Sequence, residues 1–329
     1  MNTLFSMTEA VRRYSFVMLA FMGGAISVWW FMPFKSPVKQ SCSADYPFVS
    51  SEIDCGTIDT TINQVENLKG DMSRYVDEEK RSGHITRASI FYRDLNTRRW
   101  FGIDDIAKFY PASLIKLPIS IMYYKVAELD PTILEQPLEI SAEAAGAGDA
   151  TVYYAPTQTL QAGVAHPVKD MIRSMLVYSD NTPFSTLLDA GQIFRNRVLS
   201  DLNIYDPPTE SGVEAWNITA RSYANIFRIL YNASYLNVRS SNEILEMLSQ
   251  STFTKGITAG VPSGIKVAQK FGEANELKDG EEFHILNNCG IVYKPDNPYI
   301  ICVLVEGKDF AHMERIIQRI AELSYHALE

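Results

Sequence analysis

The sequence is poor in metal-binding residues and has no excess of basic ones. It contains five histidines and four cysteines in 329 residues, and its formal net charge is -9. No basic stripe is available to neutralise phosphates, so we expect no nucleic-acid partner. The histidines are scattered, with no pair at ligand spacing, and we therefore predict no metal site. They stand at positions 84, 166, 284, 312 and 326.

Charged residues are also missing from one segment near the N-terminus, from Tyr14 to Phe34. About 20 apolar residues can cross a bilayer as a helix, so we predict a transmembrane signal-anchor over 14–34. Arg12 and Arg13 precede this run and favour a cytoplasmic tail over residues 1–13. The prediction is a single-pass protein of the cell membrane whose remaining chain is extracytoplasmic.

A cleaved signal peptide is the alternative for this segment. The apolar run is not followed by a small-x-small cleavage site, and no cysteine follows it closely enough to carry a lipid. An uncleaved anchor therefore fits the sequence better.

The four cysteines fall into two pairs. Cys42 and Cys55 lie in residues 35–60, a predicted linker or arm rich in Pro, Ser and Asp. A disulfide between them would close a short loop in an oxidising compartment. Cys289 and Cys302 lie in apolar, strand-like sequence, and we expect them to be buried free thiols.

The rest of the chain, residues 61–329, predicts an α+β domain. Strands from both ends of this part can join one antiparallel sheet covered by the first and last helices, and the middle third forms an inserted all-helical lobe. A cleft between lobe and sheet would hold the site. The predicted helices are 61–81, 171–177, 220–231 and 310–328, and the predicted strands are 88–92, 100–103, 265–269, 283–293 and 299–305.

A serine and a lysine are one helical turn apart at Ser113 and Lys116. Pro111 favours a helix start, so the serine would lie at a helix N-terminus, where developing negative charge is stabilised. A lysine in a poorly hydrated pocket beside it can act as a base. The alternative is an ordinary helix start with an exposed lysine, since Ser-x-x-Lys recurs at 36–39 and 263–266.

Two further motifs follow. Ser179-Asp180-Asn181 ends a hydrophobic helix and could project a hydroxyl and an amide into the cleft, although a simple helix cap is the alternative. Lys270-Phe271-Gly272-Glu273 continues an alternating strand. Gly272 would let a substrate backbone approach, Lys270 would add positive charge, and the Glu273 and Ser113 amides could form an oxyanion hole. A surface lysine before a bulge glycine is the alternative.

In their order and spacing, these motifs resemble the class A β-lactamases and the related penicillin-binding D-alanyl-D-alanine peptidases. The segment from Cys289 to Tyr293 also resembles the C-terminal hairpin of that family. The resemblance covers residues 61–329 and implies a β-lactamase/transpeptidase-like fold, a monomer, no cofactor and no catalytic metal. It implies acyl transfer to a β-lactam or a peptidoglycan stem peptide.

The resemblance also implies residue roles. Ser113 is the nucleophile, Lys116 assists removal of its proton, and Ser179 protonates the leaving nitrogen. Asn181 positions the substrate, Lys270 binds its carboxylate beside Gly272, and the Ser113 and Glu273 amides hold the oxyanion.

The sequence departs from the family at two places. Phe271 stands where the family carries a hydroxyl residue that contacts the substrate carboxylate. The hydrolytic glutamate, on a Glu-x-x-x-Asn loop in the family, has Glu214 as its best candidate here and Glu210 as its second, since Glu214 to Asn217 is one residue shorter. A solvated loop acid is the alternative for Glu214.

The predicted function is a membrane-anchored serine β-lactamase-like hydrolase. If no general base is placed for deacylation, the protein would instead be a cell-wall peptidase or transpeptidase inhibited by β-lactams. A non-catalytic sensor module is the third possibility, which the short cytoplasmic tail disfavours.

Overall fold

The structure is a computed structural model that describes residues 58–142, 152–204, 216–278 and 280–327. The chain divides into two units, Met1–Gly56 and Thr57–Glu329. The predicted tail, anchor and most of the arm, with Cys42 and Cys55, lie outside the described residues. Among the helices that are described, none has both the length and the apolar character needed to span a bilayer.

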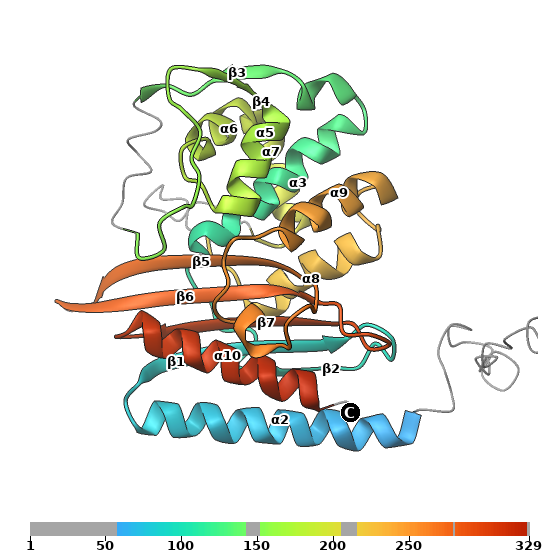
Figure 1. Cartoon of the computed structure of the whole chain (residues 1–329), viewed down its shortest axis with the longest axis vertical. Helices are drawn as coiled ribbons and strands as arrows, with labels where there is room; N and C mark the ends of the chain where they lie inside the picture. The colour runs from blue at the N-terminus through green and yellow to red at the C-terminus, as the bar shows by residue number, and fades with distance from the viewer. Residues whose placement is uncertain (1–57, 143–151, 205–215, 279, 328–329) are drawn as a thin grey trace, which may run out of the picture. The chain divides into compact units, whose positions relative to one another are not determined.

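A five-stranded antiparallel sheet forms the centre of the second unit, with strand order β2-β1-β7-β6-β5 (Figure 1). Strands from both ends of the domain join it, as predicted, and β5 lies at one edge. The strands are β1 (Ile85–Asp94), β2 (Trp100–Ile103), β5 (Val267–Lys278), β6 (Glu281–Val292) and β7 (Tyr299–Gly307).

The first and last helices, α2 (Ile58–Arg81) and α10 (Phe310–His326), cover one face of the sheet (Figure 1). The apolar positions spaced by three and four residues in each helix turn inward, so that Met72 and Ile316 are fully buried. Helix α8 (Ala220–Tyr231) packs against strands β1, β6 and β7 of the same sheet, and its buried residues belong to a different apolar cluster from those of α2 and α10. The sheet therefore separates two apolar cores.

Helix α8 begins and ends where the sequence predicts. Its first turn is closed by a capping box, in which the Thr219 hydroxyl accepts from the Ser222 amide at 3.0 Å and the Ser222 hydroxyl accepts from the Thr219 amide at 3.1 Å. Such reciprocal bonds satisfy amides that have no partner within the helix.

The inserted lobe is mainly helical, but the prediction of an all-helical lobe is wrong. Two three-residue strands, β3 (Pro137–Glu139) and β4 (Ala165–Pro167), pair within it; they are too short for an alternating pattern to reveal them. Its helical segments are η3 (Ala112–Ile115), α3 (Lys116–Ala127), η4 (Pro131–Leu134), α5 (Val168–Arg173), η5 (Ser174–Tyr178), α6 (Phe184–Ala190), α7 (Gln192–Asp201) and α9 (Val238–Ser249). The short η6 (Thr258–Gly260) packs against α10 instead.

The expectation of free thiols at Cys289 and Cys302 is also wrong. The two residues are direct partners in the register of β6 and β7, with Cα atoms 3.9 Å apart, and they form a disulfide. Both are fully buried. The apolar pattern predicts both strands, but it does not predict the register that places the two cysteines opposite each other.

Candidate active site

Ser113 lies in a single turn of 3-10 helix, η3, rather than in the first turn of an α-helix, because α3 begins only at Lys116. The turn is closed by the Leu114 amide, which donates to Pro111 O at 3.1 Å. Ala112 has a left-handed φ of 49°, an uncommon conformation for a residue with a side chain. This bend presents the half-buried Ser113 to a cleft.

Lys116 is buried rather than exposed, with 2% of its surface accessible. Its Nζ donates to the backbone oxygen of Ser179 at 2.5 Å and to Asn181 Oδ1 at 2.5 Å. Burial lowers the pKa of Lys116 to about 7, against the opposing influence of the negative charges of Asp180 and Glu273. An amine with such a pKa is partly neutral at physiological pH and can accept a proton.

Ser179 follows the π-helical turn η5 and has a left-handed φ of 59°. The conformation is fixed by the buried Asp180 carboxylate, which accepts from the Leu160 amide at 2.9 Å, the Ser174 hydroxyl at 2.7 Å and the Thr182 amide at 2.9 Å. Residues held in sparsely populated backbone regions often belong to functional sites. The motif therefore does more than cap a helix.

Lys270 is buried too, with 1% of its surface accessible, which rules out the surface-lysine alternative. Its Nζ donates to Ser179 Oγ at 2.8 Å and to Phe271 O at 2.9 Å. Burial, and then the positive charge of Lys116, hold the pKa of Lys270 well below its ordinary value. Two lysine side chains from different elements thus meet at Ser179.

Gly272 brings strand β5 against η3. A Cβ atom at this position would lie 2.8 Å from Pro111 O and 2.9 Å from Ser113 N, closer than real Cβ contacts allow. The glycine therefore permits a backbone-to-backbone approach beside the serine, rather than marking a bulge.

Glu273 is half-buried, and its carboxylate accepts from the Tyr153 amide at 2.8 Å and the Tyr154 amide at 2.7 Å. Burial raises its pKa, and the two amides partly offset this effect. The side chain thus holds the Tyr153-Tyr154 segment at the cleft, where Tyr154 is a wall residue and Tyr153 is exposed.

The cleft has a volume of about 670 Å³. Five of the predicted site residues line it: Ser113, Lys116, Ser179, Asn181 and Glu273. Lys270 and Gly272 lie directly behind, through the contacts with Ser179 and Ser113. Glu214 and Glu210 lie outside the described residues.

A model of the beta-lactamase enzyme family matches residues 70–328 of the chain. The chain belongs to the beta-lactamase enzyme family. No curated protein sequence matches it.

Solved structures share the family fold at low sequence identity. PBP-A is 17% identical, with a TM-score of 0.66 over 80% of this chain and 96% of that chain. A β-lactamase from Sphaerobacter thermophilus is 20% identical, with a TM-score of 0.66 over 78% and 96% of the two chains. A β-lactamase from Xanthomonas campestris is 17% identical, with a TM-score of 0.65 over 80% and 99%.

Three features of this beta-lactamase-family site escaped sequence reasoning. Asp180 stood inside a recognised motif, but its role as an anchor depends on partners elsewhere in the lobe. The Glu273 carboxylate was overlooked because only its amide was considered. Trp216 lines the cleft two residues after Glu214, and among the described residues no partner lies within hydrogen-bond distance of its buried Nε1.

Phe271 fills the place of the family's hydroxyl residue with an aromatic ring. The ring is buried and stacks on Phe253 with centroids 4.0 Å apart. Lys270 Nζ lies 4.5 Å from its centroid, within range of a cation–π interaction. The ring therefore packs against the lysine but provides no hydrogen-bond donor.

Proposed function

We propose that this protein is a membrane-anchored, extracytoplasmic serine hydrolase that opens β-lactam rings through an acyl-serine intermediate. The observation that carries the proposal is the meeting of Lys116 and Lys270 at Ser179, in the cleft that Ser113 lines. Such an arrangement provides a base, a proton relay and a nucleophile within one pocket.

In the proposed acylation step, Ser113 Oγ attacks the lactam carbonyl carbon while its proton passes to the neutral Lys116 amine. The amides of Ser113 and Glu273 stabilise the oxyanion. When the intermediate collapses, the C–N bond breaks and the Ser179 hydroxyl gives its proton to the nitrogen. Ser179 regains a proton from the Lys116 ammonium, so the amine returns to its neutral form.

Substrate binding is proposed to use Asn181 and Lys270. Asn181 lines the cleft, and its side-chain oxygen accepts a hydrogen bond from Lys116, which orients the side chain that is proposed to position the substrate. A substrate carboxylate near Lys270 would favour the protonated lysine, because an opposite charge stabilises the charged form. With Phe271 supplying no hydroxyl, carboxylate binding depends more on this lysine than it does in the family.

Deacylation is proposed to use Glu214 as the base that activates water. Water would attack the acyl carbonyl carbon, lose its proton to Glu214 and release the product from Ser113. The glutamate is two residues from Trp216, which lines the cleft, and this proximity along the chain supports the choice.

A penicillin-binding peptidase is the second candidate function. One solved structure of a PBP-A mutant is an acyl-enzyme complex with penicillin G, with a TM-score of 0.65 and 18% identity to this chain. An enzyme of this kind would keep the acyl group on Ser113 rather than release it.

The proposed location rests on the apolar segment 14–34 and on the Cys289–Cys302 disulfide. Disulfides persist in oxidising compartments, outside the cytoplasm. The anchor and the disulfide thus favour the same side of the membrane for the catalytic domain.

To test the proposal, the protein lacking residues 1–40 is mixed with a chromogenic cephalosporin, and hydrolysis of the cephalosporin is followed over time. We expect steady turnover that Ser113→Ala abolishes and that Ser263→Ala leaves unchanged. Ser263 is a matched control because it belongs to another Ser-x-x-Lys pattern, on an exposed loop. A stoichiometric burst with a lasting mass increase on Ser113 would support the peptidase. No covalent adduct with any β-lactam would refute both functions.

The same assay tests the hydrolytic base. Glu214→Gln should convert steady turnover into a burst, with acylation preserved. Steady turnover in that variant would show that another group activates the water.

A further inference from the structure

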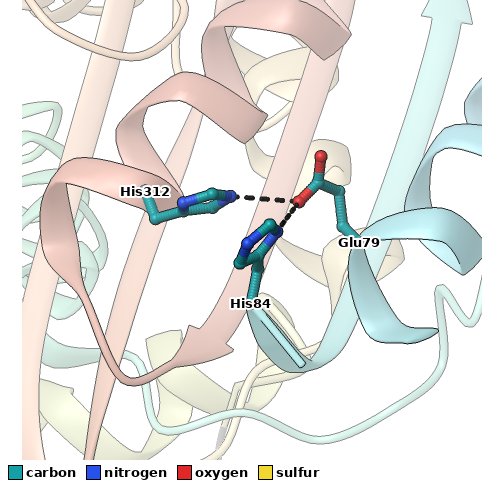
Figure 2. A group of neighbouring side chains, drawn as sticks. All are labelled: Glu79, His84 and His312. Atoms are coloured by element: carbon teal, nitrogen blue, oxygen red, sulfur yellow. Dashed lines mark hydrogen bonds and ion pairs between the residues drawn. The ribbon is translucent and has the colours of Figure 1, made fainter. Parts of the chain in front are cut away.

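Two histidines and one glutamate meet between the first and last helices of the domain. Glu79 is in the last turns of α2, His84 follows that helix directly before β1, and His312 is in the first turn of α10. Glu79 Oε2 lies 2.7 Å from His84 Nδ1 and 3.0 Å from His312 Nε2 (Figure 2). One ligand atom from each residue lies within 4.8 Å of the other two.

This group has no part in the proposed reaction. It lies with α2 and α10 on one face of the sheet, whereas the cleft is lined by residues of the inserted lobe and strand β5. His84 and His312 are far apart in the sequence, which is why histidine spacing could not predict their meeting. Their rings lie with centroids 3.8 Å apart.

The three side chains have the chemistry and spacing of a zinc site. Zn²⁺ takes imidazole nitrogen and carboxylate oxygen at about 2.0–2.2 Å in tetrahedral geometry, which separates neighbouring ligand atoms by roughly 3.3 Å. The two observed separations, 2.7 Å and 3.0 Å, need to widen by only a few tenths of an ångström. The His84 side chain is 47% exposed, so the ion can enter from solvent and a water can complete the tetrahedron.

The surroundings of Glu79 support its role as a ligand. The Tyr75 hydroxyl hydrogen-bonds to the Glu79 carboxylate, an interaction that can orient it toward the histidines. A single oxygen of this carboxylate, Oε2, faces the ring nitrogens of both histidines.

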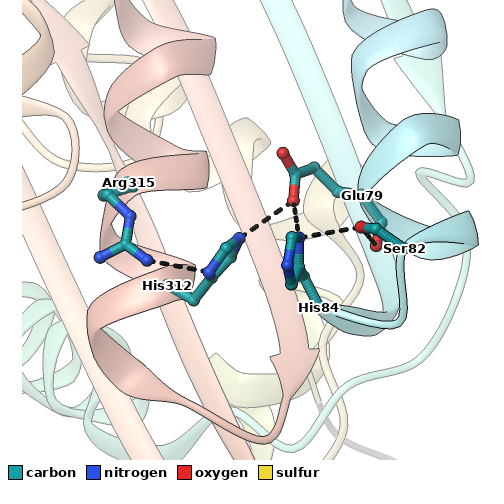
Figure 3. A network of polar contacts seen from close by, with 5 residues as sticks. All are labelled: Glu79, Ser82, His84, His312 and Arg315. Atoms are coloured by element: carbon teal, nitrogen blue, oxygen red, sulfur yellow. Dashed lines mark hydrogen bonds and ion pairs between the residues drawn. The ribbon is translucent and has the colours of Figure 1, made fainter.

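Two neighbouring groups compete with an ion for the ligand nitrogens. The Ser82 hydroxyl lies 2.8 Å from His84 Nδ1 (Figure 3), and it has to turn away when that nitrogen binds the ion. Arg315 is the second group. Its guanidinium lies 2.9 Å from His312 Nδ1, as Figure 3 shows, and an arginine can only donate in this contact. His312 Nδ1 therefore accepts, and Nε2 carries the proton shared with Glu79. When Nε2 binds an ion the proton must move to Nδ1, so the exposed Arg315 has to turn away.

We propose that Glu79, His84 and His312 bind one Zn²⁺ ion that joins α2 to α10. The ion takes the place of the proton on each ring nitrogen that now faces Glu79, and each neutral imidazole then carries its proton on its other nitrogen, Nε2 of His84 and Nδ1 of His312. Its effect is to stabilise the packing of the first helix on the last, with no catalytic step.

The test uses the full chain in mild detergent, stripped of metal by a chelator and titrated with Zn²⁺ against a chromophoric competitor. We expect one tight site per chain. His84→Gln and His312→Gln should each weaken binding by at least about tenfold, the lower end of the effect of losing even an outer-shell partner. His166→Gln, a histidine in β4, is the matched control and should bind as the unaltered chain does.

Thermal melting gives a second readout. Zn²⁺ at about one hundred times its dissociation constant for the unaltered chain should raise the melting temperature by roughly 5 °C in the unaltered chain and in the control. The same concentration should raise it by at most about half as much in the two variants, which bind at least about tenfold more weakly. Melting without Zn²⁺ shows that each variant folds.

Arg315→Gln should strengthen Zn²⁺ binding several-fold, because the glutamine side-chain oxygen can accept a hydrogen bond from the His312 Nδ1–H. The proposal would be overturned if the unaltered chain bound no Zn²⁺, or if both histidine variants bound it as tightly as the unaltered chain does.

Discussion

For the single residue Lys116, burial in the folded protein determines how readily the side-chain amine binds a proton. Its ammonium donates to two oxygen acceptors, the side chain is buried, and burial lowers its pKa to about 7. The unfolded chain therefore holds more protons than the folded chain between about pH 7 and pH 10, and folding stability rises with pH across that window. Below this window the folded protein contains a buried cation, at a cost in stability.

The first prediction concerns the pH dependence of acylation. The rate of Ser113 acylation should rise about tenfold per pH unit below pH 7 and level off above it, because the neutral amine is the base. Stopped-flow measurement of the cephalosporin burst across this range tests the profile. Lys116→Arg, which stays charged, should lose about 10²–10⁴-fold in acylation rate. A flat profile in the unaltered protein would rule out Lys116 as the titrating base.

The second prediction concerns Phe271. Replacing the ring by threonine or by valine removes the same stacking on Phe253, so both variants should lose similar stability. Only threonine adds the hydroxyl that the family uses. We expect Phe271→Thr to bind a carboxylate-bearing β-lactam about tenfold more tightly than Phe271→Val, as a hydrogen bond to a charged group would give. Equal KM values would indicate that the carboxylate is bound elsewhere.

At the scale of elements, the position of strand β5 against η3 sets the geometry of the site. The contact depends on the absence of a side chain at Gly272, where Pro111 O and Ser113 N approach from the neighbouring turn. Both atoms belong to the backbone, so a flexible side chain cannot relieve a clash by rotating away.

The third prediction is that Gly272→Ala slows acylation by about a hundredfold, since a shift of about 1 Å in a reacting group can have that effect. Gly70→Ala is its control. Gly70 lies in α2 with no atom within 4 Å of its added Cβ, so this variant should keep full activity and gain about 1 kcal/mol of stability. Acylation kinetics and thermal melting of the pair separate the two effects. Normal acylation in Gly272→Ala would contradict the close-approach argument.

The pattern of apolar and polar residues along the chain was enough to predict most helices and strands, and α8 is the clearest example. Apolar spacing and a capping threonine are both encoded within its own residues. The Cys289–Cys302 disulfide needed one further step: the turn at 294–298 fixes a register in which the two residues are opposite. Counting back equally from 294 and 298 would pair position 289 with 303, so the observed register also depends on Tyr293, which lies outside β6.

Much of the candidate site could be located from motifs, but its internal contacts could not. Asp180 bonds to groups at positions 160, 174 and 182, and Glu273 bonds to amides 119 and 120 residues away. These partners share no sequence pattern with the motif, because only the packing of lobe on sheet brings them together. The meeting of His84 and His312 has the same origin.

At the scale of the whole molecule, the fourth prediction concerns the membrane. The full chain should sediment with membranes and dissolve only in detergent, whereas deletion of residues 1–40 should release an active, soluble protein. Protease added to intact cells stripped of their outer layers should digest the domain, since it is proposed to lie outside the cytoplasm. Protection from protease in intact cells, with digestion after lysis, would place the domain on the cytoplasmic side.

Strand β5 ends the sheet and contacts η3 and α9, and it also provides Glu273 to the cleft wall. A free sheet edge invites a neighbouring chain to add its own strand. Any self-association along the exposed part of β5 would crowd the entrance that a ligand must use. Self-association at high protein concentration should therefore lower the specific activity, so the proposed reaction favours the monomer.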